Sequence, residues 1–238
     1  MDNQITTNNV NPQIKKLENN LSLAQQLKII EQLLAQGEIG EKSLIDYLIH
    51  RRIINKQQIT LLDGIIFEKL YNTNYDHIQV QLTKYFNKGI IQLSNNLMLD
   101  YQPLQDLLIK QQFQEADKLT QKYLCKLAGL ETRKTRTWLY FTDIAIIPSE
   151  DLLNIDLLWN TYSRGKFGFS VQRKIWINNK CQWNKFWQTI GWTKKDIPCR
   201  YPGEFIWTID APKGHLPLFN QLRGVQVLSA LFNHIVWQ

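Results

Sequence analysis

The sequence predicts an all-α fold in two parts, on three observations. Apolar residues recur at helical spacing along most of the chain, and no stretch alternates convincingly with a period of two. A polar segment at residues 89–100 separates two groups of helices and is expected to be a linker. The first group, at residues 14–88, should form a helical bundle. The second group, at residues 101–238, should form an all-helical domain with one long loop rich in proline and glycine.

The N-terminal part is expected to hold four short amphipathic helices behind a polar, disordered tail at residues 1–13. The helices are predicted at 14–36, 39–53, 56–71 and 76–88, with Gly37 and Gly89 ending the first and the last. The apolar residues spaced for burial in the second and third helices are Leu44, Tyr47, Leu48, Ile59, Leu62, Ile66 and Leu70. The cluster at His50, Arg51 and Arg52 could contact nucleic acid, although cations there more often complement the negative end of a helix.

The second part is predicted to begin with two helices joined by a turn. Their apolar positions are Leu104, Leu107, Leu108, Phe113, Ala116, Leu119 and Leu124. A polar, basic loop is expected at 130–138 and a further helix at 183–190.

The stretch from Pro148 to Trp176 organises this second part, because its pattern indicates a helix, a glycine turn and another helix. Ser149 and Ser170 are expected to cap the two helices, since a serine hydroxyl can accept a hydrogen bond from a free backbone amide. The buried face should contain Leu152, Ile155, Trp159, Val171 and Ile175. Gly165 and Gly168 permit a tight turn that presents Phe167 and Phe169.

A long loop is predicted at residues 197–215, where three prolines and two glycines prevent a regular helix. Long loops in compact domains are usually functional or disordered. Tyr201, Phe205, Ile206 and Trp207 make this loop too apolar for a disordered linker, so we expect it to pack or to cover a ligand. A last helix is predicted from Leu218 to Trp237, with an inner face of Leu222, Val225, Leu228 and Phe232.

Composition and charge limit the class of protein. Hydrophobic residues make up 44% of the chain, which is enough for a core, and no apolar run reaches the roughly 20 residues of a membrane-spanning helix. The net charge is +7, and nine basic residues between Arg164 and Arg200 accompany one acid and seven aromatic residues. A basic, aromatic surface suits a flat anionic partner, and both nucleic acid and a tetrapyrrole qualify. Cys125, Cys181 and Cys199 are expected to be small buried thiols.

The residues that could carry chemistry also have structural interpretations. Asp151 and Asp156 could act as acid and base, but no histidine lies near them in sequence. We therefore expect Asp151 to place charge at a helix start and Asp156 to anchor a neighbouring loop. The run SRGKFG lacks the spacing of a phosphate-binding loop. His215 could bind a metal, but a lone histidine is more often a hydrogen-bonded structural residue.

Two motifs, in this order, resemble the genomes-uncoupled-four family. They are DLLNIDLLWNTYSRGKFGFSVQ at residues 151–172, and APKGHLP at 211–217 followed by NQLRG at 220–224. The resemblance covers residues 101–238 well and the N-terminal part by general type. It implies a protein that binds protoporphyrin IX and Mg-protoporphyrin IX and stimulates magnesium chelatase in chlorophyll synthesis, through the porphyrin-binding large subunit, without being an enzyme. The structural positions of the motifs are Asp151, Asp156, Trp159, Gly165, Phe167, Gly168, Phe169 and His215.

A tetrapyrrole site needs an apolar cleft, cations for two propionates and a cover. Tyr201, Phe205 and Trp207 can supply the cover and a stacking surface. By resemblance, Asn220 and Arg223 line the porphyrin cleft, and residues three apart share a helix face. Gln226 lies on the same face, where some family members carry a basic residue, so one carboxylate contact would be weaker here. No metal bound by the protein itself is expected.

Two classes of function stay open: a porphyrin-binding regulator, and a basic helical protein that binds nucleic acid. The second has no recognisable nucleic-acid-binding motif, so no nucleic acid is expected as partner. An enzyme ranks third, because no nucleophile–base pair or metal-binding cluster is evident. The N-terminus lacks a signal or transit peptide, and Asn, Ile, Lys and Gln are plentiful, as in AT-rich genomes. Together with the resemblance, this suggests a plastid-encoded protein of the chloroplast stroma. The alternative is a cyanobacterial cytoplasm. Peripheral association with a membrane is left open.

Overall fold

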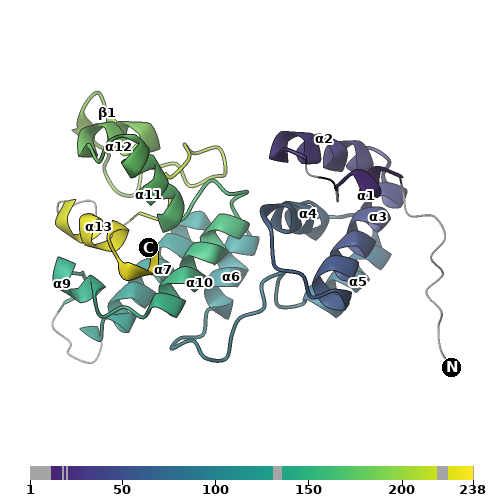
Figure 1. The fold of residues 1–238 in the computed structure, drawn as a ribbon, viewed down its shortest axis with the longest axis horizontal. Coiled ribbons are helices and arrows are strands. Elements are labelled where there is room, and N and C mark those ends of the chain that lie inside the picture. The colour runs from purple at the N-terminus through teal and green to yellow at the C-terminus, as the bar shows by residue number, and fades with distance from the viewer. Residues whose placement is uncertain (1–11, 18, 20, 131–135, 219–224, 238) are drawn as a thin grey trace. The chain divides into compact units, whose positions relative to one another are not determined.

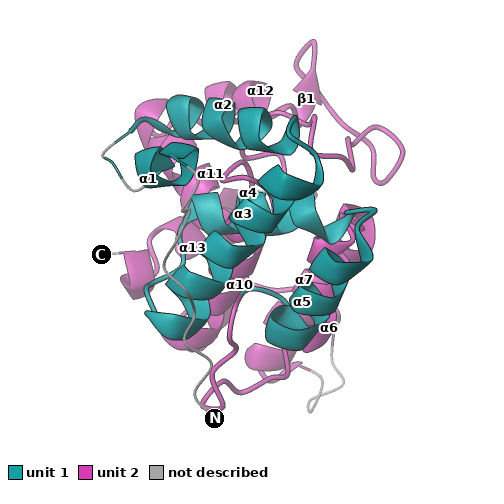
Figure 2. Cartoon of the chain, turned by 90° about the vertical axis from the view of Figure 1, so that its right-hand side faces the viewer, with its two compact units in different colours: residues 1–90 teal, residues 91–238 magenta. Residues whose placement is uncertain are grey.

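The computed structural model describes residues 12–17, 19, 21–130, 136–218 and 225–237, and they form a mostly helical protein (Figure 1). The predicted all-α class is confirmed, with one exception. A short antiparallel hairpin, formed by β1 (Thr193–Lys194) and β2 (Ile197–Pro198), follows the helix predicted at 183–190. None of the described helices is both long and apolar enough to cross a membrane. The chain divides into two compact units, unit 1 (Met1–Ile90) and unit 2 (Ile91–Gln238) (Figure 2).

Unit 1 is a bundle of short helices, and capping explains why two of them differ from the predicted ranges. Its elements are α1 (Pro12–Leu17), α2 (Leu23–Leu34), α3 (Glu38–Ile49), the π-helix η1 (His50–Ile54), α4 (Leu61–Tyr71) and α5 (Asp76–Phe86). Ser22 and Gln25 form a capping box at the start of α2, so the helix predicted at 14–36 is two helices. Thr60 and Asp63 form another, so α4 begins at Leu61 instead of residue 56.

One further sequence expectation for unit 1 needs correction, and another needs to be extended. The predicted disordered tail ended at residue 13, but residues 12 and 13 already belong to α1, and residues 1–11 lie outside the described residues. Arg51 and Arg52 do lie in the last turn of η1, but Arg51 also has a partner on another helix. Its Nε lies 2.8 Å from Oδ1 of the fully buried Asp63, so it pairs η1 with α4. The residues predicted to be buried that fall in α3 and α4 are buried, whereas Ile59, which precedes α4, is partly exposed.

Gly40 explains how α2 and α3 pack so closely in unit 1. A Cβ atom at this position would lie 1.7 Å from the carbonyl oxygen of Leu33 on α2. No side chain fits at that distance, so the two helix backbones meet at a residue that has none.

Unit 2 carries both sequence motifs. Its elements are α6 (Gln102–Ile109), α7 (Phe113–Leu127), α9 (Phe141–Ile144), α10 (Ser149–Thr161), α11 (Phe169–Asn178), α12 (Trp183–Ile190), the β1–β2 hairpin, α13 (Val225–Phe232) and the 3-10 helix η3 (Ile235–Trp237). The last helix is shorter than predicted in its described part, because Leu218 is not helical and α13 ends at Phe232. Leu222 and residues 131–135 of the predicted basic loop lie outside the described residues.

The core of unit 2 is centred on Trp159, which is fully buried in α10. Its ring stacks on Phe113 of α7 with 6.0 Å between the ring centroids, and Phe167 meets Phe113 edge to face at 5.4 Å. The indole N–H of Trp159 donates to Oγ1 of Thr120 at 2.9 Å, so the one polar atom of the ring is satisfied. These contacts join α7, α10 and the glycine turn into one framework on which the long loop rests.

Candidate functional site

The turn between α10 and α11 depends on Gly168, whose φ of +124° is disfavoured for residues that carry a β-carbon. A Cβ atom there would lie 2.7 Å from Oδ1 of Asp156. The N–H of Gly168 donates to the carbonyl of Leu216 at 3.0 Å, which ties the turn to the long loop. Phe167 and Phe169 flank the glycine and are fully buried, so this turn adds aromatic rings to the core instead of presenting them.

Asp156 anchors the start of α11 from the neighbouring helix. Its Oδ1 accepts a hydrogen bond from the backbone N–H of Ser170 at 2.8 Å. Burial raises the pKa of Asp156, and the hydrogen bonds from Ser170 and Phe169 oppose that rise. The predicted serine caps are therefore wrong: Ser170 is the second residue of α11, after Gly168, and Ser149 is the first residue of α10.

Asp151 has a larger role than the helix-start charge predicted for it. It is buried, and its Oδ1 accepts hydrogen bonds from the Tyr101 hydroxyl at 2.8 Å and from the Met98 amide at 3.1 Å. Asp151 therefore fastens the segment that precedes α6 to the first turn of α10.

The segment at residues 199–218, named the aromatic loop here, is held mainly through its backbone. Lys166 Nζ donates to the carbonyl of Ile209 at 2.6 Å, and the indole N–H of Trp192 donates to that of His215 at 2.8 Å. Gln172 Nε2 donates to the carbonyls of Gly214 and Pro217, at 3.0 and 2.8 Å. Side chains from outside the loop thus help to fix its path.

His215 is a buried, hydrogen-bonded residue whose two ring nitrogens are both engaged. Nδ1 lies 2.6 Å from the carbonyl oxygen of Ile190, so this nitrogen carries the proton and donates. Nε2 accepts from the N–H of Ile206 at 3.0 Å. Burial lowers the pKa of His215, which keeps the ring neutral and suited to this one-donor, one-acceptor arrangement.

The three aromatic residues predicted for the site come together in the aromatic loop but differ in exposure. Phe205 is only 5% exposed and packs on His215, with 5.6 Å between ring centroids. Tyr201 is 41% exposed and meets the partly exposed Trp207 edge to face at 5.9 Å. Tyr201 and Trp207 therefore offer ring surface, whereas Phe205 supports the loop from inside.

The other predicted site residues follow the aromatic loop. Asn220 and Arg223 lie outside the described residues. Gln226 is an exposed residue near the start of α13. The structure thus brings Tyr201, Phe205 and Trp207 together. That Asn220 and Arg223 belong to the same site remains a prediction.

The basic, aromatic window predicted at residues 164–200 is not one continuous binding surface. Its buried rings are Phe167, Phe169, Trp176, Phe186 and Trp192. Trp183 and Trp176 pack against Phe232 of α13, at 6.1 and 5.5 Å. Two cations of the window bind carbonyls, because Lys166 reaches Ile209 and Arg173 Nε donates to Phe232 at 2.7 Å. Much of the window is therefore scaffold.

The cysteines form no site that the structure supports. Cys125 and Cys199 are buried as expected, but Cys181 is exposed in the turn between α11 and α12, so the prediction of a buried thiol is wrong there. Within the described ranges no three His, Cys, Asp or Glu side chains are grouped so that they could hold a metal ion.

The sequence reasoning missed Asp117, which fastens the end of the aromatic loop to α7. Its Oδ1 accepts a hydrogen bond from the backbone N–H of Leu218 at 2.6 Å, across 101 positions of sequence. The sequence does contain a sign of this role, because Asp117 and Thr120 fall on the same side of the helix as the apolar Phe113, Ala116 and Leu124. A polar residue on a buried stripe needs a partner.

Burial raises the pKa of the Asp117 carboxyl to about 8, although the Leu218 amide and the nearby Lys118 oppose the rise. The folded protein therefore holds a proton that the unfolded chain, with a pKa near 3.9, releases. The stability linked to this proton is fully present below about pH 4 and is lost as pH rises to about 8.

Replacing Asp117 with asparagine should remove this pH dependence, because an amide oxygen still accepts the Leu218 hydrogen bond but does not titrate. As pH rises from 5 to 7, we expect the unfolding free energy of wild type to fall relative to that of Asp117→Asn, by up to about 1.4 kcal/mol per pH unit. Urea unfolding at several pH values measures the difference. If plots of unfolding free energy against pH were parallel for the two proteins, Asp117 would not carry the proton.

Together, the fold and this loop define a class: mostly helical proteins in which a long loop with exposed aromatic rings is pinned to a helical core. The chain belongs to the GUN4 family. Residues 94–235 match its GUN4-like model, and residues 5–87 match the model of the ARM-like repeat domain found N-terminal in GUN4.

Known relatives are similar over much or nearly all of the chain. The protein ycf53 of Porphyra purpurea is 48% identical over 97% of this chain and 98% of its own length. The chloroplastic tetrapyrrole-binding protein of Arabidopsis thaliana is 38% identical over 55% of this chain and 52% of its own. The solved structure of GUN4 from Chlamydomonas reinhardtii is 41% identical, with a TM-score of 0.57 over 62% of this chain and 97% of that one.

Proposed function

We propose that the protein binds protoporphyrin IX and Mg-protoporphyrin IX and stimulates magnesium chelatase, as a regulator and not as an enzyme. The observation that carries the proposal is the family match at residues 94–235, which includes the whole aromatic loop. A relative in that family, from Arabidopsis thaliana, is named a tetrapyrrole-binding protein. The relatives' sources, among them a red alga and a cyanobacterium, fit a plastid or cyanobacterial origin.

The chemistry of the aromatic loop supports this ligand class. A porphyrin is a flat apolar ring with two propionates, and exposed aromatic faces such as those of Tyr201 and Trp207 can stack on it. Lys118 opposes the rise that burial and Asp117 cause in the pKa of Tyr201, but its ammonium already pairs with Glu115 at 2.8 Å. Arg200 and Lys213 are exposed in the same loop. In the proposed complex these cations and Arg223 bind the propionates.

In this proposal His215 does not bind the metal of Mg-protoporphyrin, since both of its ring nitrogens already make hydrogen bonds. The proposed site therefore recognises the ring by its flat face and its carboxylates. We propose the porphyrin-binding large subunit of magnesium chelatase as partner and the plastid stroma as location. The segments proposed are a site-bearing domain at 101–238, a linker at 89–100, and a bundle at 14–88 that serves packing or partner binding.

A titration of the full chain with protoporphyrin IX, followed by tryptophan quenching and porphyrin absorbance, tests the first half of the proposal. We expect saturable binding that a fragment of residues 91–238 retains, provided that the fragment keeps its helicity by circular dichroism. A salt-dependent shift with DNA or RNA and no saturation with porphyrin would favour a nucleic-acid-binding protein instead. The second half is tested by the rate of magnesium insertion by purified chelatase, which should rise when the protein is added.

A further inference from the structure

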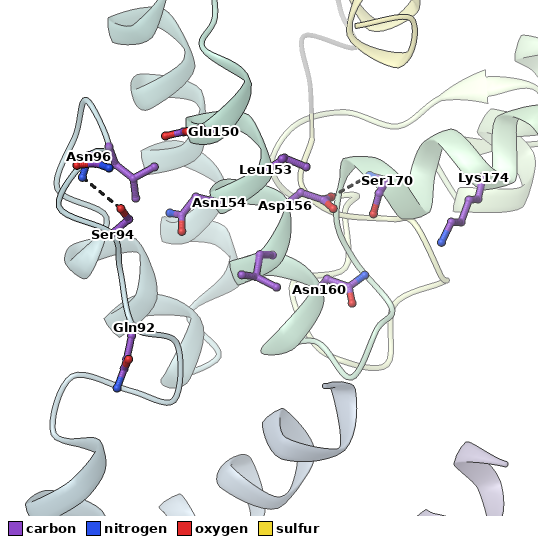
Figure 3. Close-up of a pocket in the computed structure, with 12 residues that line it drawn as sticks. Gln92, Ser94, Asn96, Glu150, Leu153, Asn154, Asp156, Asn160, Ser170 and Lys174 are labelled. Carbon is purple, nitrogen blue, oxygen red and sulfur yellow. Dashed lines mark hydrogen bonds between the residues drawn. The ribbon is translucent and has the colours of Figure 1, made fainter. Parts of the chain in front are cut away.

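Asp117 differs from the other buried aspartates of the protein in how few hydrogen bonds it accepts. Besides Asp117, the buried aspartates among the described residues are Asp63, Asp143, Asp151 and Asp156. Each of these accepts hydrogen bonds from at least two groups. Figure 3 shows one such bond, from the Ser170 amide to Asp156. From the described residues Asp117 accepts a single bond, that of the Leu218 amide.

A buried carboxylate with one donor is poorly stabilised as an ion, so this geometry favours the protonated form of Asp117. The residue is only 5% exposed. Lys118 is the cation that acts on it within the described ranges, and the Lys118 ammonium is exposed and lies 2.8 Å from Glu115. Asp117 is therefore an uncharged carboxyl near pH 7, in agreement with its raised pKa.

This uncharged carboxyl is close to both ends of the aromatic loop. At the end of the loop it accepts the Leu218 amide at 2.6 Å. Near the start of the loop it acts on Tyr201, because burial raises the pKa of this phenol and the Asp117 carboxylate raises it further. Glu115 and Lys118 of α7 act on the same phenol with opposite signs. Charge at Asp117 is thus felt by the exposed ring at one end of the loop and by the backbone at the other.

We propose that the uncharged Asp117 carboxyl is a requirement for binding an anionic porphyrin, so that ligand affinity depends on one proton. The inference rests on the proposed function, because the porphyrin is the ligand proposed there. It adds a residue that recognises the charge of the ligand by having none itself.

Two effects of ionising Asp117 weaken binding in the same direction. A carboxylate beside Tyr201 repels the two propionates of a porphyrin that stacks on this ring. A carboxylate with one donor is also better stabilised by water than by its buried position, which favours release of Leu218 from α7. Leu218 stands two positions before Asn220 and five before Arg223, so its seat on α7 affects the place of both predicted site residues.

Proton linkage sets the size of the effect. If the porphyrin binds only the protein with an uncharged Asp117, the dissociation constant is nearly constant below about pH 7 and rises as Asp117 loses its proton. With a pKa of about 8, the rise between pH 7 and pH 9 is about tenfold. By reciprocity, a bound porphyrin makes Asp117 hold its proton more tightly by the same coupling free energy.

The test measures the dissociation constant of protoporphyrin IX by tryptophan quenching of the full chain, from about pH 6.5 to about pH 9. Asp117→Asn keeps an acceptor for the Leu218 amide but does not ionise, so its dissociation constant should stay at the low-pH value of wild type. The matched control is Asp151→Asn, which changes a buried aspartate whose donors, Met98 and Tyr101, lie outside the loop. This control should follow the wild-type curve, and circular dichroism at each pH shows that the proteins remain folded.

A surface variant keeps the test decisive if Asp117→Asn does not fold. Lys118→Gln removes the cation that opposes the raised pKa of Asp117, so the rise in the dissociation constant should begin at a higher pH. A wild-type dissociation constant that changes less than about twofold between pH 7 and 9, or an equal rise in Asp117→Asn, would overturn the role of Asp117 and leave the proposed function intact. An unshifted curve for Lys118→Gln would also overturn that role. Absence of saturable binding at every pH would overturn the proposed function and this inference together.

Discussion

Replacing Trp159 with alanine is expected to lower the free energy of unfolding of unit 2 by about 3–5 kcal/mol. The ring is fully buried, stacks on Phe113 and lies against Phe167, so its removal leaves a cavity among three elements. It also leaves Oγ1 of Thr120 without the indole donor, since this oxygen accepts from Trp159. Urea unfolding followed by circular dichroism measures the loss.

Two controls separate cavity formation from other effects. Trp159→Phe keeps an aromatic ring in the core and should lose less than half as much stability. Trp207→Ala removes a tryptophan that is partly exposed in the aromatic loop, so it should cost about 1 kcal/mol or less. A loss below about 1 kcal/mol for Trp159→Ala would contradict the central position of this residue in the core.

Replacing Arg223 with alanine is expected to weaken protoporphyrin IX binding roughly ten- to a hundredfold. A hydrogen bond between a guanidinium and a carboxylate contributes about 1.5–3 kcal/mol when it is partly shielded from water. Arg223→Lys should recover only part of the affinity, because an ammonium group does not match the two oxygens of a carboxylate. The dissociation constant is measured by tryptophan quenching, and Lys194→Ala, at an exposed lysine of β1, should leave it unchanged.

The competing interpretation is that Arg223 only stabilises the chain around it. That interpretation predicts a fall in melting temperature without porphyrin that accounts for the loss of binding. The melting temperature of the ligand-free variant is therefore measured beside the dissociation constant. A normal dissociation constant for Arg223→Ala, or a loss of binding that follows unfolding, would show that Arg223 does not bind the porphyrin.

Helical spacing predicted the class of fold and most buried faces, because burial in a helix repeats at a short, local period. The starts of helices were harder to predict. Ser149 resembles a cap, yet Pro148 occupies the capping position. The capping boxes at Ser22 and Thr60 are local signals that would have located two helix starts, but they were overlooked. The β1–β2 hairpin could not be predicted, because strands of two residues show no alternation and Lys195, the first of the two left-handed turn residues, is not a type that favours this conformation.

The candidate site was predictable only in part, for a physical reason. Aromatic residues in a long loop are visible in sequence, and Tyr201, Phe205 and Trp207 do lie together. Their exposure depends on how the loop folds back on itself, so the burial of Phe205 against His215 of the same loop could not be foreseen. The same holds for Asp117, because its partner amide lies 101 positions away.

The way in which the aromatic loop is fastened has a consequence for how this protein can change over evolution. Lys166, Gln172 and Trp192 bind carbonyl groups that almost any residue of the loop would supply equally well. Mutations within the loop can therefore alter which ring faces and charges it displays while its course is preserved. A change in one of the three fastening side chains would instead remove one of several anchors, because Gly168, His215 and Asp117 also tie the loop to the core. Exposed residues such as Tyr201 can therefore change at little risk to the fold, whereas Phe205 and His215 are loop residues that also shape the loop.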